Sequence, residues 1–315
     1  MTRRINYLLL ALLVFVGGPV WYLFIDSSPW TGKAVRLDIA EARHLVAATP
    51  GQKPVGVAFD LVAFRSAPAN FLAAGSGFRR QPIGVIAFRL EVPNGAPIMI
   101  ESGITPAHAR ELGMENYDAA AQHRLDESLR AASLILVTHE HADHLGGLVA
   151  LTAAPDGSEI AAKAKLNRFE TPGAQGMQAL HWAAGMQIPA TLDQDRPQLV
   201  APGVVVLPTP GHTPGSQMIY VQLANGTELL FAGDTAPREI SWQERRPPSR
   251  LFTDFVQPQD RAALVGWLQA LQDLHKSSPR LLIIPGHDVD WLIDPNNKVP
   301  LIRMSDKPAQ KGAGK

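Results

Sequence analysis

The sequence predicts a layered α/β domain preceded by an N-terminal apolar helix, and three observations support this prediction. First, 46% of the 315 residues are hydrophobic and 18% are charged, which is too much apolar material for a disordered chain. Second, short β-like runs alternate with helical segments in both halves of the chain. Third, 26 glycines and 26 prolines indicate many turns rather than a long helical bundle.

Charge and cysteine content exclude several classes of function. The 29 basic and 29 acidic residues cancel, so a generally basic nucleic-acid binder is disfavoured and no nucleic-acid partner is expected. The chain has no cysteine, which excludes disulfide scaffolds, cysteine-ligated metal centres and cysteine nucleophiles. Any metal ion must therefore be held by His, Asp or Glu side chains.

The first 25 residues are predicted to be a targeting segment. Arg3 and Arg4 precede an almost wholly apolar run over residues 5–25, which as a helix is long enough to cross a hydrocarbon core of ~30 Å. The two alternatives are a membrane anchor and a cleaved signal peptide. The nearest cleavage site ends at Gly18 and is followed by Pro19 and more apolar residues, so the anchor is favoured. The basic residues would stay inside, which places the rest of the chain on the periplasmic or extracellular side, or makes it secreted if the segment is cut.

The remaining chain is predicted to consist of a linker, one domain and a tail. Residues 26–36 contain Ser, Pro and Gly and are predicted to form a short linker. Residues 37–303 are predicted to form the domain. Residues 304–315 are polar and are predicted to be a disordered tail.

Within the domain, periodicity and turn residues predict each element. Short apolar runs near turn residues predict strands, and amphipathic or alanine-rich runs predict helices. Two turns, Pro93-Asn94-Gly95 and Asn225-Gly226, predict hairpins. In chain order the predictions are a helix at 38–48, strands at 55–64, 83–92 and 97–100, a helix at 117–132, a strand at 134–137, helices at 146–151 and 175–186, strands at 204–207, 217–223 and 229–231, a helix at 260–276 and a strand at 281–284.

The most informative segment is the run HEHADH at residues 139–144, which directly follows the predicted strand at 134–137. In a loop that leaves a strand, residues two apart can point the same way, so His139 and His141 can share one ion. Asp143 and His144 then turn toward another position. Imidazole and carboxylate together suit Zn²⁺, and also Fe or Mn.

Three further candidate ligands each follow a β-like run. His212 lies in PGHTPG at 210–215, Asp234 in AGDT at 232–235 and His287 in PGHD at 285–288. Functional sites of α/β sheets are built at strand ends, and the glycine before each ligand lets the backbone approach closely. Together the seven side chains are sufficient for two metal ions.

In this order the motifs resemble those of the metallo-β-lactamase superfamily of metallo-hydrolases. The resemblance covers residues 83–291 and implies a four-layer αββα sandwich with two metal ions at one edge of its two sheets. Glu101-Ser102 stands where the superfamily commonly has Asp-Thr, a position that is usually a structural support. The ligands that the resemblance implies are His139, His141 and His212 for the first metal, Asp143, His144 and His287 for the second, and Asp234 as the bridge.

The resemblance implies a dinuclear zinc hydrolase in which a hydroxide between the metals attacks a small-molecule substrate. Asp143 is the candidate proton carrier and catalytic residue. β-Lactam hydrolysis is disfavoured, because true β-lactamases of the superfamily commonly have Cys or Ser in place of Asp234. The His287-Asp288 pair is similar to superfamily lactonases, although these often have a Tyr shortly after the bridging Asp and this chain does not. Cleavage of a lactone, ester or amide is therefore the leading expectation.

Two alternatives stay open: a phosphodiesterase or sulfatase that uses the same site, and a non-catalytic membrane-anchored binding module. Residues 237–257 are rich in arginine and aromatic side chains and form either a lid that reads an anionic or amphiphilic substrate or a solvated loop. Residues 70–80 form either a second mobile loop or a hairpin tip. Tyr220 is either a substitute for the missing Tyr or a core residue. The candidates for substrate binding are Arg238, Trp242 and Tyr220.

Overall fold

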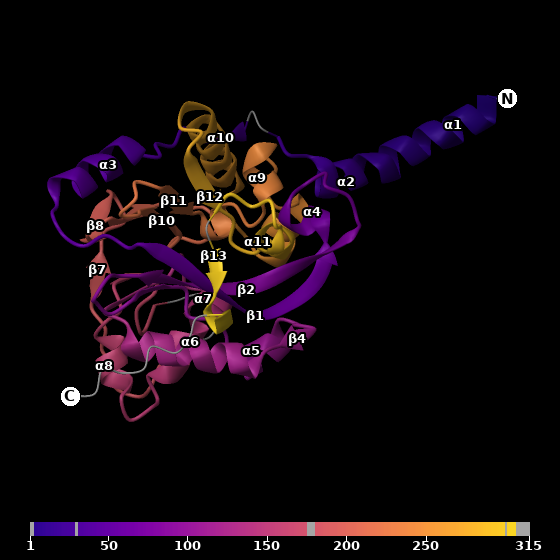
Figure 1. Ribbon diagram of the computed structural model, residues 1–315. Coiled ribbons are helices and arrows are strands. Elements are labelled where there is room, and N and C mark those ends of the chain that lie inside the picture. Colours follow the sequence, from indigo (N-terminus) through magenta and orange to yellow (C-terminus); the bar gives the residue numbers. More distant parts are fainter. Residues whose placement is uncertain (1–2, 29–30, 175–179, 300, 307–315) are drawn as a thin grey trace.

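The computed structural model describes residues 3–28, 31–174, 180–299 and 301–306 and has four layers: helices, two sheets, and helices again (Figure 1). Two sheets pack face to face, and helices cover the outer face of each. This is the αββα arrangement that the motifs implied. The N-terminal helix projects away from the four layers.

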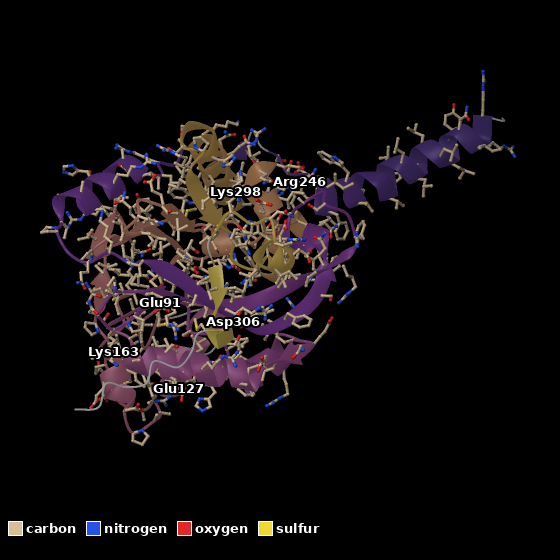
Figure 2. The ribbon with its side chains drawn as sticks, viewed as in Figure 1. Glu91, Glu127, Lys163, Arg246, Lys298 and Asp306 are labelled. Carbon is tan, nitrogen blue, oxygen red and sulfur yellow. The ribbon has the colours of Figure 1, made fainter. Side chains whose placement is uncertain are left out.

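Residues 3–25 form one continuous helix, the only one among the described residues that is long and apolar enough to cross a membrane. Its side chains project without neighbours along most of its length (Figure 2). By length and composition it suits either an anchor or a signal sequence. Its parts are α1 Arg3–Leu12, a wide π-helical turn Leu13–Gly17, α2 Gly18–Val20 and a second wide turn Trp21–Ile25.

The segment predicted as a linker packs against the domain. Asp26 is buried, and its carboxylate accepts a hydrogen bond from Arg250 Nε at 2.9 Å. Further along, the backbone N–H of Lys33 donates to the Ala262 carbonyl oxygen at 2.9 Å. The described residues of 26–36 therefore hold the end of the apolar helix against the domain instead of forming a flexible connection.

The first sheet has the strand order β13-β1-β2-β3-β5, with β4 paired to β1. The predicted turn at 93–95 joins the antiparallel strands β2 and β3, and β3 runs parallel to β5. The sheet therefore ends at β5, the strand that precedes the HEHADH segment. The strands are β1 Gly56–Pro68, β2 Arg80–Glu91, β3 Ile98–Ile100, β4 Asn116–Tyr117, β5 Leu134–Leu136 and β13 Leu301–Arg303.

The second sheet has the strand order β12-β11-β10-β9-β8. The predicted Asn225-Gly226 turn joins the antiparallel strands β10 and β11, and β11 runs parallel to β12. A separate two-stranded sheet pairs β6 Leu166–Asn167 with β7 Ala190–Leu192. The strands of the second sheet are β8 Gln198–Ala201, β9 Val204–Pro208, β10 Gln217–Gln222, β11 Glu228–Phe231 and β12 Leu281–Ile284.

Helices form the two outer layers. The layer on the first sheet consists of α5 Pro106–Glu111, α6 Ala119–Ala131, α7 Ala142–Leu151 and α8 Gly157–Ala161. The other side of the sandwich carries α3 Ile39–Ala48, α9 Glu239–Gln243 and α10 Arg261–Ser277. α11 Val289–Ile293 packs on β2, with Leu292 in the core between the two sheets, and α4 Ala69–Leu72 connects β1 to β2 in the chain.

Burial on both faces explains why the central strands read as continuous apolar runs. In β9, Val204 and Val206 belong to the core between the two sheets, whereas Val205 and Leu207 belong to the core under α3 and α10. A strand covered on both sides has no solvent face, so polar alternation is lost.

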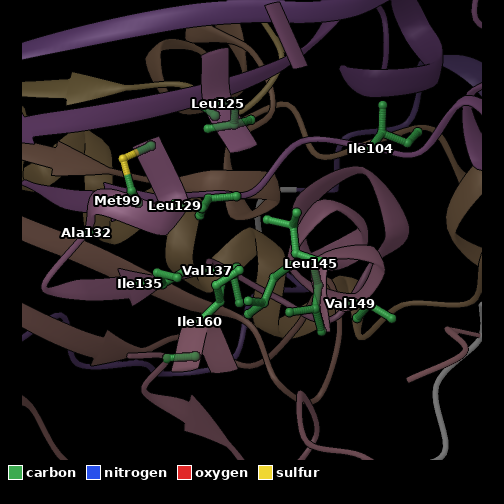
Figure 3. Packing of buried hydrophobic residues seen from close by; sticks show 14 of the residues in the cluster. Met99, Ile104, Leu125, Leu129, Ala132, Ile135, Val137, Leu145, Val149 and Ile160 are labelled. Atoms are coloured by element: carbon green, nitrogen blue, oxygen red, sulfur yellow. The ribbon is translucent and has the colours of Figure 1, made fainter. Parts of the chain in front are cut away.

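A third apolar core lies between the first sheet and its helices (Figure 3). Leu125 and Leu129 of α6 are four residues apart and share one face of the helix, and both are fully buried. Leu145 and Val149 repeat the same spacing on α7. This core holds α7, and therefore the end of the HEHADH segment, against β5.

Most predicted elements are confirmed, but the helix expected to open at Gly146 is longer than predicted. It begins at Ala142, so Asp143 and His144 lie in its first turn. The two glycines do not delimit the helix, because Gly147 packs against the loop after β3: a Cβ there would lie 1.8 Å from the Ser102 carbonyl oxygen.

Two other expectations are wrong where the structure describes them. The helix predicted at 175–186 is absent from residues 180–186, where Gly185 forms a turn with a φ of 77°, and residues 175–179 lie outside the described residues. The tail predicted to be disordered from residue 304 is instead ordered over residues 304–306, which form a helical turn. Met304 is buried in the core under the first sheet, and residues 307–315 lie outside the described residues.

The approach of α7 to residue 102 can be tested by adding one methyl group. We expect Gly147→Ala to lower the free energy of unfolding by about 1–3 kcal/mol, because the helix or the loop must shift to admit the Cβ. Chemical denaturation followed by tryptophan fluorescence measures this change.

Gly146→Ala is the matched control. A Cβ at residue 146 would have its nearest neighbour at 3.6 Å, and alanine favours a helix over glycine by ~1 kcal/mol. This variant should therefore be as stable as the parent or slightly more stable. Equal losses in the two variants would contradict the close approach at residue 147.

Candidate metal centre

The ends of β5, β9, β11 and β12 bring all seven predicted ligands to one edge of the sandwich. β5 leads into the HEHADH segment, and each of the other three strands leads into a short glycine-containing loop. The first sheet thus supplies His139, His141, Asp143 and His144, and the second supplies His212, Asp234 and His287.

The first group comprises three histidines and one carboxylate with ligand atoms within 4.8 Å of one another. His141 Nδ1 lies 2.7 Å from His139 Nε2 and 3.0 Å from His212 Nε2. Asp234 Oδ2 lies 3.3 Å from His212 Nε2. Ligand atoms at about 2.0–2.2 Å from a tetrahedral zinc ion stand ~3.4 Å from each other, so this group has the size of a single metal site.

The second group comprises Asp143, His144 and His287. The Nε2 atoms of the two histidines lie 3.3 Å apart, and Asp143 Oδ2 lies 3.7 Å from His287 Nε2. Asp234 reaches this group with its other oxygen, because Oδ1 lies 2.9 Å from His287 Nε2. The Asp234 carboxylate therefore presents one oxygen to each group, as a bridging ligand does.

Burial and neighbouring charge set the protonation of these side chains. Burial lowers the pKa of His141 to about 3 and holds that of His139 well below its usual range, which favours the neutral imidazole that binds metals. Burial alone would raise the pKa of Asp143 and Asp234. His144 and His287 outweigh that effect at Asp143, and His287 and His212 do so at Asp234, so both carboxyl pKa values lie below their usual range.

Glu101 fixes the orientation of His144. One Glu101 carboxylate oxygen lies 3.2 Å from His144 Nδ1, and the other accepts a hydrogen bond from Thr138 Oγ1 at 2.6 Å. Burial opposes a charge on His144, but Glu101 and Asp143 outweigh it and raise the pKa of His144 to about 10 in the ion-free protein. This contact leaves Nε2 free to face the second group, as expected for a metal-binding histidine held by a carboxylate.

Close packing of the ligand loops holds the two groups together. His287 Nδ1 donates to the Gly84 carbonyl oxygen at 2.6 Å, so its Nε2 also faces the second group. A Cβ at Gly286 would lie 2.9 Å from Asp234 Oδ1, so only glycine fits beside that carboxylate. Thr213 Oγ1 donates to the Glu140 carboxylate at 2.7 Å, which ties the His212 loop to the HEHADH segment.

This donor set fits a divalent metal ion. Five buried imidazoles and two carboxylates converge, and nitrogen and oxygen donors of this kind suit Zn²⁺, Fe or Mn. Burying so many ionisable groups is costly unless they are paired or coordinate a metal. The geometry therefore indicates a metal-binding site.

A cavity of about 630 Å³, counted with its open mouth, lies over both groups. Its mouth and walls are largely apolar, with a few polar side chains. The side chain of Gln257 contacts one of the ligands, with its Nε2 2.9 Å from His141 Nε2. Besides the ligands His141, Asp143, His212, Asp234 and His287, the cavity is lined by Arg65, Leu72, Ile83, Gly84, Leu112, Met114, Pro237, Pro248, Phe252, Gln257 and Gln259.

The three candidates for substrate binding are not among the described residues that line this cavity. Arg238 is buried and pairs with the Asp288 carboxylate at 3.2 Å. Trp242 is buried in the core under α10. Tyr220 is fully buried and donates a hydrogen bond to Glu228, at the opposite end of β11 from Asp234. All three make their contacts within the protein, away from the described lining of the cavity.

Most arginines of the 237–257 stretch also have protein partners. Arg245 donates to Gln269 Oε1 at 2.7 Å, and Arg246 pairs with Glu244 at 2.6 Å. Arg250 pairs with Asp26 at 2.9 Å. The stretch does cover the cavity, but it contributes the aromatic ring of Phe252 and an amide rather than cationic groups.

Several wall residues were missed by sequence reasoning. Arg65, Leu112 and Met114 reach the cavity from β1 and from the turn after α5. No motif marks them, because their role depends on how distant segments pack together. Only the aromatic and amide side chains of 237–257 had a local signal, namely their position between two ligand motifs.

Comparisons with known proteins agree with the fold. A family model described as "Metallo-beta-lactamase superfamily" matches residues 82–287. A search of curated protein sequences gave no match. One similar solved structure is an N-acyl homoserine lactone hydrolase with its product N-hexanoyl-L-homoserine bound at the catalytic metal center, with 16% identity, coverage of 76% of this chain and 95% of that chain, and a TM-score of 0.54.

Two other solved structures show a comparable likeness. One is a quorum-quenching N-acyl homoserine lactone lactonase, with 17% identity, 76% and 95% coverage and a TM-score of 0.54. The other is a mutant of B. thuringiensis AiiA with N-decanoyl-L-homoserine bound at the active site, with 18% identity, the same coverage and a TM-score of 0.53. At these identities the likeness concerns the fold alone.

The role of Glu101 can be tested through metal affinity. We expect Glu101→Gln to weaken metal binding by about 10- to 100-fold, because His144 loses the carboxylate that orients it. Titration of the ion-free protein against a competing chelator measures the change.

Glu127→Gln is the control, because Glu127 is an exposed residue of α6 (Figure 2) that belongs to neither ligand group. This variant should bind metal as the parent does. If Glu101→Gln also binds with the parent affinity, the contact with His144 has no part in metal binding.

Proposed function

The chain belongs to the metallo-beta-lactamase superfamily and is a metal-dependent hydrolase, and from this premise we propose that it cleaves a lactone, ester or amide that carries an apolar group. The observation that supports this substrate class is the apolar wall of the cavity. Leu72, Met114 and Phe252 line it beside the ligands. Such side chains accommodate a hydrocarbon portion while the carbonyl faces the ligand groups.

In this proposal two zinc ions are bound at the two groups. The chemistry that such ions supply when bound is a water nucleophile near neutral pH together with a polarised carbonyl. The assignment follows the grouping of the donors: His139, His141 and His212 would hold one ion, Asp143, His144 and His287 would hold the other, and Asp234 could serve both.

The chain's own side chains then divide the remaining tasks. Asp143 lines the cavity, and it is the proposed proton carrier, receiving a proton at the carboxylate oxygen that does not face His287 and passing it to the leaving group. Gln257 offers an amide beside His141 that can orient a substrate oxygen. Phe252 and Met114 hold the apolar portion and exclude water.

The engaged arginines disfavour a phosphodiester or sulfate ester as the substrate. The lid stretch offers no free cationic group to the cavity, and Arg65 is the one Lys or Arg among the described lining residues. Its Nη1 donates to the Leu112 carbonyl oxygen at 2.7 Å. Among the described lining residues, an anionic substrate would thus meet the charge of Arg65 alone besides the metal ions.

Metal content measured together with turnover tests this proposal. We expect the purified full-length chain to contain about two zinc ions and to hydrolyse a lactone or ester panel in a chelator-sensitive manner, but not bis-p-nitrophenyl phosphate. If the chain hydrolyses only the phosphodiester, the proposed lactone, ester or amide class is wrong and the phosphodiesterase alternative is correct.

A matched pair of histidine variants controls for general effects. His139→Ala should lose metal and lower kcat/KM by about 100-fold or more, whereas His123→Ala, at an exposed position on α6, should retain both. Equal activity in the two variants would contradict the assignment of His139.

A further inference from the structure

The last turn of the N-terminal helix is bonded to the two segments that form the cavity mouth. We define these mouth segments as residues 69–79 and 245–259, which contribute Leu72, Pro248, Phe252, Gln257 and Gln259 to the cavity. The Phe24 carbonyl oxygen accepts a hydrogen bond from the Gly75 N–H at 2.9 Å. On the other mouth segment, the Arg250 guanidinium lies 4.7 Å from the centre of the Tyr22 ring.

Buried charge makes this junction stiff. Asp26, the first residue after the helix, is 5% exposed, and Arg261 is 7% exposed. Arg261 donates to the carbonyl oxygens of Asp26 and Pro248, and Arg250 pairs with the Asp26 carboxylate. Separating the helix end from the domain would leave these charges without partners, which is strongly unfavourable for buried ion pairs.

Exposed apolar side chains gather on the same two segments. Outside the helix, the described residues include six exposed large apolar side chains, and three of them, Phe78, Phe255 and Val256, lie in the mouth segments. Phe78 also contacts the helix directly, because its ring lies 5.3 Å from that of Phe24 in an edge-to-face arrangement. The apolar surface of the helix therefore continues onto the domain.

The position of the helix end sets the height of this surface relative to a bilayer. Trp21 and Tyr22 are about half exposed at the end of the apolar run, and such rings settle at the level of the lipid headgroups. Residues 22 to 26 rise by only ~6 Å along a helix. Mouth segments bonded to residues 22–26 must then lie at or next to the headgroup layer.

We propose that the face formed by Phe78, Phe255, Val256 and the helix end rests on the bilayer surface, so that the cavity opens at the lipid. The cavity then takes its substrate, an amphiphile whose carbonyl group carries an acyl chain, from the membrane rather than from bulk water. The seating of the face depends on residues 3–25 being a retained membrane anchor and on the contacts of the helix end. The source of the substrate also rests on the proposed hydrolase function.

The absence of natural cysteines permits a direct test of the seating. Phe78→Cys and Phe255→Cys place a single label on the proposed face, and Ile302→Cys is the matched control, because Ile302 is also exposed and apolar but lies on the edge strand β13. The labelled full-length protein is reconstituted into phosphatidylcholine–phosphatidylglycerol nanodiscs that contain nitroxide-labelled lipid, and fluorescence quenching is measured.

We expect strong quenching at residues 78 and 255 and none at residue 302. Quenching at 78 and 255 that is no stronger than at 302 would show that the face stands in water or that the domain has no fixed orientation, and either result would overturn the proposal.

Activity tests the source of the substrate. Phe255→Asp should lower the turnover of a long-chain ester embedded in vesicles by about tenfold, because a charge replaces an exposed ring that the proposal places in the lipid. Turnover of a short water-soluble ester should be unchanged. Equal effects on both esters, or no effect on either, would overturn supply from the membrane.

If the unaltered metal-loaded chain hydrolyses neither ester, the proposed function fails together with the substrate source, and the quenching pattern still decides the seating.

Discussion

The carboxylate of Asp234 is the point on which both halves of the sandwich depend. It leaves β11 of the second sheet with one oxygen 3.3 Å from His212 Nε2 and the other 2.9 Å from His287 Nε2. The HEHADH segment meets it from the first sheet. Without this anion, five buried imidazoles would converge at one edge with little to compensate their desolvation. The stacking of the two sheets and the close packing of the glycine loops bring the other ligand side chains to this carboxylate.

Short sequence motifs predicted those parts of the fold and the site whose positions are set within a few residues of a strand end. The HEHADH run, the glycine-flanked ligands and the Asn-Gly turn lie within a few residues of the strands they follow, so their positions could be predicted from spacing. The cavity wall could not, because Arg65 and Met114 approach the ligands only after the layers pack. The same holds for the linker, since Asp26 finds its partner Arg250 at a distance of 224 residues. The start of α7 was missed because packing at Gly147 outweighs its low helix propensity.

The segment at 245–259 has two tasks that the sequence alone did not connect. It covers the ligand groups with Phe252 and Gln257, and it holds the end of the apolar helix through Arg250. Arg250, one of the arginines that suggested recognition of an anionic substrate, instead serves the second task. If the proposed seating on a bilayer holds, access to the cavity and attachment of the domain to the membrane are properties of one continuous surface.

The central claim is that two metal ions lie on either side of Asp234, and anomalous diffraction from crystals grown with zinc tests it most directly. The account predicts two peaks at the zinc absorption edge, about 3.5–4 Å apart, one among His139, His141 and His212 and the other among Asp143, His144 and His287, with Asp234 in contact with both. A single peak away from Asp234, or none in a folded protein with these side chains in place, would contradict it.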